Sequence, residues 1–277
     1  MKIAVLSDIH GNLAALHAIA EDIHRWQPDK IVVAGDIINR GPLPRQCLDF
    51  TLERERYSGW LVLRGNHEEY VINVAADPSA RVGAEEAVRA NVRWTAAQIG
   101  DVAPLLAMPT QISLQGPDGG EVRIVHASMR HNRDNVLINT PDDELRAQIA
   151  PAPTVFCCGH THRPLLRQID ATLVVNTGAV GLPFDDDVRG SYARLNWRGE
   201  SWHAEIVRVP YDRDQAARDY EAGFLSESGP IAPIIWSEFL TAHPRLSTWY
   251  RRYETALLEG RINVEQSVTE LLAENVM

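Results

Sequence analysis

The segment MKIAVLSDIHGN, residues 1–12, sets the pattern from which the fold of this chain is predicted. Residues 2–7 form a short apolar run that is typical of a buried strand. Asn12 opens a helix whose inner face carries Leu16, Ile19 and Ile23. Asp8 and His10 lie between the strand and the helix. An acid and an imidazole therefore follow the first strand directly.

The same arrangement recurs along the chain. Apolar runs at 31–34, 60–63 and 154–158 predict strands, and residues 109–126 predict a hairpin. Side chains able to bind a metal follow or end these strands: Asp36 after the second, Asn66 and His67 after the third, His126 at the end of the hairpin, and His160 and His162 after residues 154–158. In open α/β sheets the ligand crevice lies beyond the carboxyl ends of the strands. We therefore expect these side chains to converge.

Each of these residues has an ordinary explanation when it is taken alone. Asp8 is suited to cap a helix or to occupy a turn. Asp36 and Asn66 each follow a glycine, as turn residues often do. His126 is compatible with a satisfied strand-end histidine, and the alternate spacing of His160 and His162 with coincidence. All of these coincidences would have to occur together, so the pattern favours one shared site.

Carboxylates and imidazoles are suitable ligands for Mn, Fe or Zn. No cysteine is placed to build a structural zinc cage. Asp36 follows the central strand of the set, which makes it the natural candidate to bridge two cations. Two metals about 3.5–4 Å apart can clamp a phosphate and activate a water.

Five segments resemble the calcineurin-like metallophosphoesterases. They are SDIHGN (7–12), GDIINRGP (35–42), RGNHE (64–68), VHAS (125–128) and GHTH (159–162), and both their order and their spacing match. The resemblance covers roughly residues 1–210. It implies an α/β fold, a β-sandwich flanked by helices, with the site at one edge.

The resemblance also implies a role for each site residue. The first metal would be held by Asp8, His10, Asp36 and His162, and the second by Asp36, Asn66, His126 and His160. His67 would lie over the substrate as a proton donor. The expected cofactors are two divalent or mixed-valence metal ions.

Segments 159–162, 174–183 and 191–195 resemble the small prokaryotic phosphodiesterases of this superfamily. The stretch DIINRGP also resembles dinucleoside tetraphosphatases and Ser/Thr protein phosphatases, in which the arginine matching Arg40 contacts the substrate phosphate. Protein phosphatases carry an aspartate where this chain has Asn39, which weakens that resemblance and leaves open what orients His67.

The expected function is hydrolysis of phosphodiesters or nucleotide polyphosphates through a metal-activated hydroxide. A Ser/Thr-type protein phosphatase or phosphomonoesterase is the alternative. A non-catalytic scaffold of the same fold is the least favoured, because every ligand position is filled.

The sequence predicts two regions. Residues 1–210 form the metallophosphoesterase domain, and residues 211–277 a helical C-terminal extension packed on the core, with helices at 212–224, 245–259 and 263–274. Trp249 and Tyr253 stand at helical spacing, which predicts docking on the core or self-association. A homo-oligomer is therefore left open.

Bulk properties limit the partners. The net charge of -10 argues against strong nonspecific binding of nucleic acid. No run is long enough to span a membrane, and the amino terminus is a strand and not a signal peptide, so we expect a cytoplasmic protein with reduced thiols at Cys47, Cys157 and Cys158. A small phosphoester or nucleotide is the expected substrate.

Two further polar segments are weaker candidates. Arg130, His131 and Arg133 are equally compatible with a phosphate grip and with a solvated loop. The run Asp185-Asp186-Asp187 predicts a solvated turn.

Overall fold

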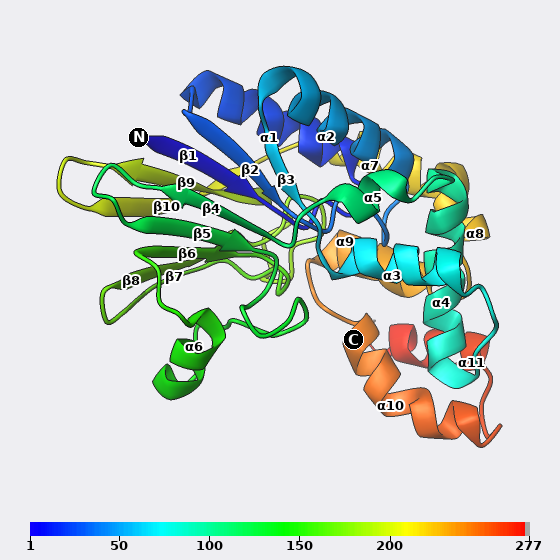
Figure 1. Ribbon diagram of the computed structural model, residues 1–277. Coiled ribbons are helices and arrows are strands. Elements are labelled where there is room, and N and C mark those ends of the chain that lie inside the picture. Colours follow the sequence, from blue (N-terminus) through cyan, green and yellow to red (C-terminus); the bar gives the residue numbers. More distant parts are fainter. Residues whose placement is uncertain (275–277) are drawn as a thin grey trace.

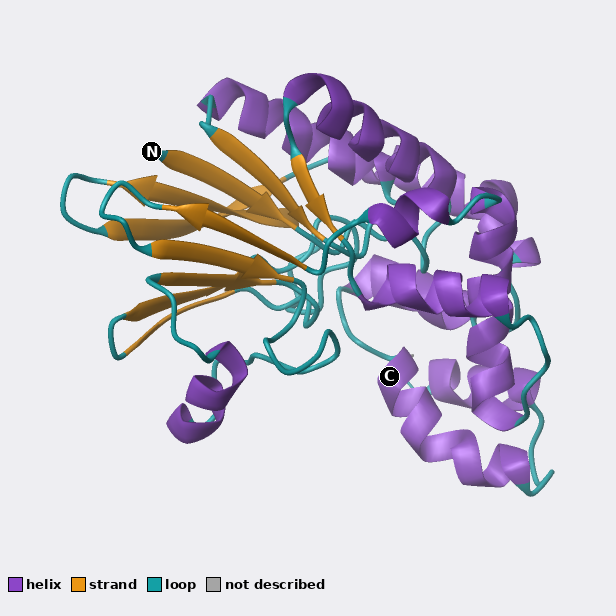
Figure 2. Ribbon diagram, in the orientation of Figure 1, coloured by secondary structure: helices purple, strands orange, loops and turns teal. Residues whose placement is uncertain are grey.

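Two five-stranded sheets lie against each other at the centre of the computed structural model, which describes residues 1–274 (Figures 1 and 2). One sheet has the order β10-β9-β1-β2-β3 and the other the order β4-β5-β6-β8-β7. The strands of the first sheet are β1 (Lys2–Leu6), β2 (Lys30–Ala34), β3 (Leu61–Leu63), β9 (Gly190–Trp197) and β10 (Trp202–Val209). Those of the second are β4 (Gln111–Gln115), β5 (Glu121–Val125), β6 (Val155–Cys158), β7 (Leu165–Ile169) and β8 (Thr172–Asn176).

Strand β1 shows why the first sheet is buried on both faces. Side chains alternate across a strand, so Ile3 and Val5 enter the cluster shared with Val122 and Ile124 of the second sheet. Ala4 and Leu6 point the other way, into the cluster made with the helices. This apolar run therefore serves two cores, as in other sheets covered on both sides.

Helices cover the outer faces of both sheets. α1 (Leu13–Trp26) and α2 (Pro44–Ser58) pack on the first sheet, and α6 (Asp142–Ile149) packs on the second. α3 (Asn66–Ala76), α4 (Gly83–Ile99) and α5 (Ala103–Ala107) follow β3. Asn12 caps α1 by accepting a hydrogen bond from the amide of Ala15, at 3.1 Å, as the opening segment predicts.

The C-terminal region is helical. It contains α7 (Arg213–Asp219), a π-helical turn (Tyr220–Phe224), α8 (Leu225–Glu227), α9 (Ala232–Thr241), α10 (Leu246–Leu258) and α11 (Val264–Ala273). Trp249 is fully buried and donates to Ser267, in a cluster that includes Ala84 and Ala87 of α4. The Trp249–Tyr253 stripe therefore packs within this chain. The division at residue 210 stays a prediction.

Four described elements were not predicted, and one of them is the three-residue helix α8. β7 is an edge strand with alternating exposure, and α5 is a short turn of helix. α9 begins within a segment that carries Pro230 and Pro233, residues that usually mark a break. Pro233 stands in the first helical turn, where its missing N–H costs no hydrogen bond. Among the described residues, no helix combines the length and the apolar character needed to cross a bilayer.

Candidate metal centre

The predicted ligands converge where the carboxyl ends of the two sheets meet. Figure 2 shows the parallel strands of both sheets ending at one group of loops on the side of the C-terminal helices. Asp8, His10, Asp36 and His162 form one buried group of possible ligand atoms, and Asp36, His126 and His160 form a second; within each group the atoms lie within 4.8 Å of one another. Asp36 belongs to both groups.

Asn66 joins the second group through its side-chain oxygen. Its Oδ1 lies 2.9 Å from Nε2 of His126 and 2.8 Å from Nδ1 of His160. Asn66 is the first residue of α3, directly after β3 and its loop. All seven predicted ligands are therefore brought together from five strand ends.

The backbone at these strand ends is unusual. Eleven non-glycine residues of the described chain have positive φ angles, and five of them are predicted ligands: Asp8, His10, Asp36, His160 and His162. Asn39 and Arg40 are two more. Such conformations are unfavourable for residues with a Cβ and gather at functional sites. The turns therefore hold these side chains at an energetic cost, which is independent support for a site here.

Three imidazoles are oriented by backbone carbonyls. Nδ1 of His10 lies 3.1 Å from the carbonyl oxygen of Asn39, and Nδ1 of His126 lies 2.8 Å from that of Ala34. Nδ1 of His162 lies against the carbonyl of Leu182. A ring that donates through Nδ1 keeps the lone pair of Nε2 free, which is the usual arrangement of a metal-binding histidine.

The two aspartates each keep one oxygen free. Asp8 Oδ2 accepts from Ser7 and from the amide of His160, whereas its Oδ1 is buried without a hydrogen-bond partner. Asp36 Oδ1 accepts from the amide of His67, and its Oδ2 is buried without a hydrogen-bond partner, 3.2 Å from Nε2 of His126. Unpartnered buried carboxylate oxygens are costly. A cation between the two groups would satisfy both.

The charges of the centre are mutually compensating. Burial by itself raises the pKa of Asp8, but the imidazoles of His162 and His10 lower that pKa well below its usual range. Burial lowers the pKa of His126, yet the Asp36 carboxylate, 3.2 Å away, raises it to about 10. Burial lowers the pKa of His160 to about 4, so its ring is neutral. The donor set, the ring orientations and the free oxygens fit a pair of metal ions.

Glu68 supports this centre and was not predicted as a site residue, although it stands in the quoted segment RGNHE. Its carboxylate accepts from the amides of Gly65 at 2.7 Å, Asp36 at 2.8 Å, Ile37 at 2.8 Å and Ile38 at 3.3 Å. Burial and the Asp36 carboxylate raise the pKa of Glu68 to about 7, which these amide donors oppose. Glu68 therefore ties the loop of Asp36 to the start of α3.

Gly65 makes this close approach possible. A Cβ at this position would collide with Oδ1 and the backbone nitrogen of Asp36. The glycines of RGNHE and GDIINRGP thus bring the loops after β2 and β3 into direct contact.

Replacing Glu68 by alanine is expected to lower the free energy of unfolding by roughly 3–5 kcal/mol, because several buried amides lose their acceptor at about 1–3 kcal/mol each. Denaturant unfolding with a chelator present measures this without a contribution from metal binding. Glu69→Ala is the control, since Glu69 is partly exposed and lies 3.8 Å from Arg64 in a weak ion pair. Equal losses in the two variants would contradict the bracing role.

His67 lies beside the two ligand groups and outside them. Its Nε2 is 3.9 Å from Asp36 Oδ2. Its Nδ1 is 2.7 Å from the side-chain nitrogen Nδ2 of Asn39. Thr95 of α4 donates to the amide oxygen of Asn39 at 3.1 Å. Asn39, which replaces the protein phosphatase aspartate, therefore orients His67. Burial lowers the pKa of His67 well below its usual value, and Arg40 adds to this effect.

Two arginines of the basic loop, Arg130 and Arg133, have different surroundings. Arg130 is held by Asp134 and Glu144, so its charge is already compensated. Arg133 lies over the ring of Tyr70, with its Cζ 5.0 Å from the ring centroid, and both line a cavity together with His67 and Arg40.

The aspartates of the turn at residues 185–187 contact basic side chains of this chain. Asp185 pairs with Arg208, Asp187 pairs with Arg189, and Asp186 contacts His243. Within the described residues this turn is not part of a possible metal group.

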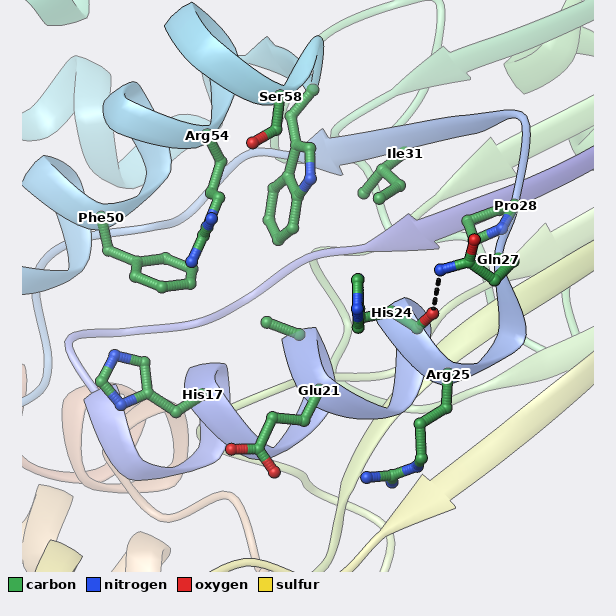
Figure 3. A pocket seen from close by; sticks show the side chains of 12 residues that line it. His17, Glu21, His24, Arg25, Gln27, Pro28, Ile31, Phe50, Arg54 and Ser58 are labelled. Carbon is green, nitrogen blue, oxygen red and sulfur yellow. Dashed lines mark hydrogen bonds between the residues drawn. The ribbon is translucent and has the colours of Figure 1, made fainter.

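A larger cavity, of about 770 Å³, lies away from the metal centre between α1 and α2 (Figure 3). Figure 3 shows His17 and Glu21 of α1 facing Phe50 and Arg54 of α2 across it. None of the predicted site residues lines this cavity. His17 contacts Phe50 across this space, with 5.0 Å between the ring centroids and a tilt of 54° between the ring planes. This surface is therefore separate from the candidate site.

Comparison with known proteins gives a consistent picture. Residues 1–200 match the model of the calcineurin-like phosphoesterase superfamily domain. The uncharacterised protein MJ0912 of Methanocaldococcus jannaschii is 28% identical over 234 residues, which cover 77% of this chain and 89% of that protein. Every predicted metal ligand lies within the matched residues, whereas α7 to α11 lie beyond them.

Two solved structures share the fold. The hypothetical protein PH1004 from Pyrococcus horikoshii superimposes with a TM-score of 0.73 at 20% identity, covering 87% of this chain and 98% of that chain. A metallophosphoesterase from Sphaerobacter thermophilus gives 0.67 at 24% identity, covering 87% and 99%. The predicted α/β fold, two sheets flanked by helices with further helices at the C-terminus, is confirmed.

Proposed function

This chain belongs to the calcineurin-like phosphoesterase superfamily, and on that premise we propose that it hydrolyses phosphodiesters or nucleotide polyphosphates at a two-metal centre. The observation that carries the proposal is the pair of buried ligand groups that share Asp36. A complete donor set favours catalysis over a scaffold role, because a scaffold has no need to bury two carboxylates that each keep one oxygen without a hydrogen-bond partner.

The donor set suggests how the metals are shared. Asp8, His10 and His162 would hold one ion; Asn66, His126 and His160 would hold the other; and Asp36 would contact both. Their mixture of nitrogen and oxygen donors suits Mn, Fe or Zn. When bound, two such ions supply Lewis-acid activation of a phosphate group and of water.

The protein's own groups would bind and orient the substrate. Arg40 is partly exposed beside His67, and an arginine can bind two phosphate oxygens through parallel charge-assisted hydrogen bonds. His67 is held by Asn39 with its Nε2 on the side of Asp36, so this nitrogen can donate to an oxygen of the bound phosphate group. We propose that His67 transfers a proton to the leaving oxygen.

A hydrolysis screen tests the proposed function. The full chain is assayed with added Mn²⁺, Fe²⁺ or Zn²⁺ against phosphomonoesters, phosphodiesters, cyclic nucleotides, dinucleoside polyphosphates and phosphopeptides. We expect turnover of a diester or a polyphosphate that is abolished by a chelator. A protein that binds two metals per chain and hydrolyses none of these would be a scaffold, and turnover confined to phosphopeptides would identify a protein phosphatase.

Arg40→Ala is expected to lower kcat/KM by roughly 10- to 100-fold, the loss typical of a hydrogen bond to a charged group, while the metal content stays at the wild-type value. Arg40→Lys should recover only part of this loss, because an ammonium group cannot reproduce the planar fork. Steady-state kinetics with parallel metal analysis measures both quantities. Arg45→Ala is the control, since Arg45 is exposed on α2 and pairs with Asp49. Wild-type kinetics for Arg40→Ala would mean that Arg40 is only a loop residue and does not bind the substrate phosphate.

A further inference from the structure

A second cavity, of about 510 Å³, lies beside the metal centre. His67 and Arg40 line it, together with residues of α3, α4 and α10. Its volume falls within the range of small-molecule sites, roughly 300–1,000 Å³. Ile231, Leu246 and Tyr250 form one wall, and these residues lie beyond the range matched by the family model. The C-terminal helices therefore shape a space that the shared domain alone does not define.

The position of this wall is fixed by packing. α4 packs against both α3 and α10 (Figure 1). Leu246 and Ile231 are buried in the cluster that holds Trp249. The hydroxyl of Tyr220 also donates to the backbone carbonyl of Arg40, at 3.3 Å, which joins the C-terminal helices to the loop of the site. The C-terminal helices that supply the wall therefore also contact the loop of Arg40.

Two tyrosines offer flat surfaces in this cavity. Tyr70 of α3 meets the His67 ring edge-on, with 5.2 Å between the ring centroids. Tyr250 of α10 is half-buried and lines the same cavity. Aromatic rings that line an enclosed space beside a phosphate site are suited to stack on a planar base.

The cavity also contains uncompensated positive charge. Within the described residues, the guanidinium groups of Arg40 and Arg133 have no hydrogen-bond or ion-pair partner. Arg133 instead lies over the Tyr70 ring. Arg89 donates from its Nη2 to the backbone carbonyl of Asp77, whereas its Nε is buried without a hydrogen-bond partner. Among the described residues that line the cavity, Glu85 is the one acid. This concentration of cations contrasts with the net charge of -10 and indicates an anionic ligand that carries more than one phosphate or phosphate-like group.

We propose that this cavity binds the nucleoside part of the substrate, so that the substrate is a nucleotide ester or nucleotide polyphosphate. The base would lie against Tyr70 and Tyr250, Arg40 would bind the reacting phosphate, and Arg133 would bind a neighbouring anionic group. The inference rests on the proposed function, because the reacting phosphate must lie at the metal centre. It adds that substrate selection depends on the C-terminal helices.

The first test is binding without hydrolysis. Titration calorimetry on the chelator-treated full chain compares adenosine 5′-monophosphate with methyl phosphate, which lacks the nucleoside. We expect the nucleotide to bind at least about tenfold more tightly, as one base stack provides. Tyr250→Ala should remove most of this preference, and Arg133→Gln should weaken nucleotide binding. Equal affinity of the wild-type chain for the two ligands would overturn the proposal, whatever the variants do.

Matched controls come from α2. Tyr57 is 71% exposed, and Arg56 lies over its ring with 5.3 Å from Cζ to the ring centroid, as Arg133 does over Tyr70. Tyr57→Ala and Arg56→Gln should leave nucleotide binding unchanged. A similar loss in the α2 and cavity variants would also overturn the proposal, because the effect would then not come from the cavity.

The second test separates this inference from the proposed function. With Mn²⁺ added, the chain is assayed on thymidine 5′-(p-nitrophenyl phosphate) and on methyl p-nitrophenyl phosphate, which share the same leaving group. We expect a higher kcat/KM for the nucleoside ester and a loss of that advantage in Tyr250→Ala. Hydrolysis of both esters at equal kcat/KM would leave the proposed function standing and refute the nucleoside cavity. Tight nucleotide binding without hydrolysis of either ester would support the nucleoside cavity and refute the proposed function.

Discussion

Asp36→Asn is expected to bind fewer than one metal per chain and to lose at least about 10²-fold in kcat/KM. Changes to groups that only orient a ligand already cost 10–100-fold, and Asp36 is the residue common to both ligand groups. Asparagine has nearly the same shape as aspartate, and it keeps an oxygen able to accept from the amide of His67. It removes the negative charge that compensates His126. Metal analysis and kinetics on the same preparation measure the two losses.

Thermal unfolding distinguishes lost metal from a damaged fold. A ligand that binds only the native state stabilises it by mass action, so Mn²⁺ should raise the Tm of the wild-type chain and leave that of Asp36→Asn nearly unchanged. In chelator any difference in Tm between the two reflects the lost pair of Asp36 with His126, so the comparison uses the rise in Tm that Mn²⁺ causes in each chain. Asp22→Asn is the matched control, because Asp22 is partly buried on α1 and binds Tyr192 and Arg194. If Asp36→Asn keeps two metals, Asp36 is not their shared ligand.

The sequence was informative about the centre because its ligands follow strands. Asp8 and Asp36 each come two residues after an apolar strand, so recognising the strand also places the carboxylate. Parallel strands within one sheet bring their carboxyl ends to the same edge. Joining the two sheets requires more than this rule, since His126 and His160 follow strands of the second sheet. The predicted convergence treated all five strands alike, and the resemblance to a β-sandwich added the two-sheet arrangement.

What the sequence did not predict depends on contacts between distant residues. Glu68 was visible as part of RGNHE, but its four amide donors come from loops after two different strands. The approach of Tyr250 to the cavity of His67 depends on how α10 packs against α4. α9 was missed because its prolines were compatible with a loop. The local sequence pattern predicts the helices and strands. The packing of these elements against one another decides which of their side chains line the same cavity.

His67→Gln is expected to keep both metals and to lose roughly 10²- to 10⁴-fold in kcat/KM on a nucleotide ester, the usual contribution of a positioned general acid. A ribose alkoxide is strongly basic and needs a proton as it leaves, whereas a nitrophenolate leaves without one. The loss on a nitrophenyl ester should therefore be much smaller. Steady-state kinetics on the two ester classes, with metal analysis, gives this ratio. His17→Gln serves as the control, because His17 is exposed in the separate cavity between α1 and α2.

Burial lowers the pKa of His67 well below its usual value, which favours the neutral ring in the absence of substrate. To act as a proton donor, His67 must take up a proton as the anionic substrate binds, since a nearby negative charge favours the charged imidazole. A glutamine can still donate a hydrogen bond but cannot transfer a proton. Equal losses on both ester classes, with the metals retained, would therefore mean that Asn39 holds His67 as a neutral donor that stabilises charge on the phosphate. Small losses on both classes would leave His67 with a packing role beside Tyr70.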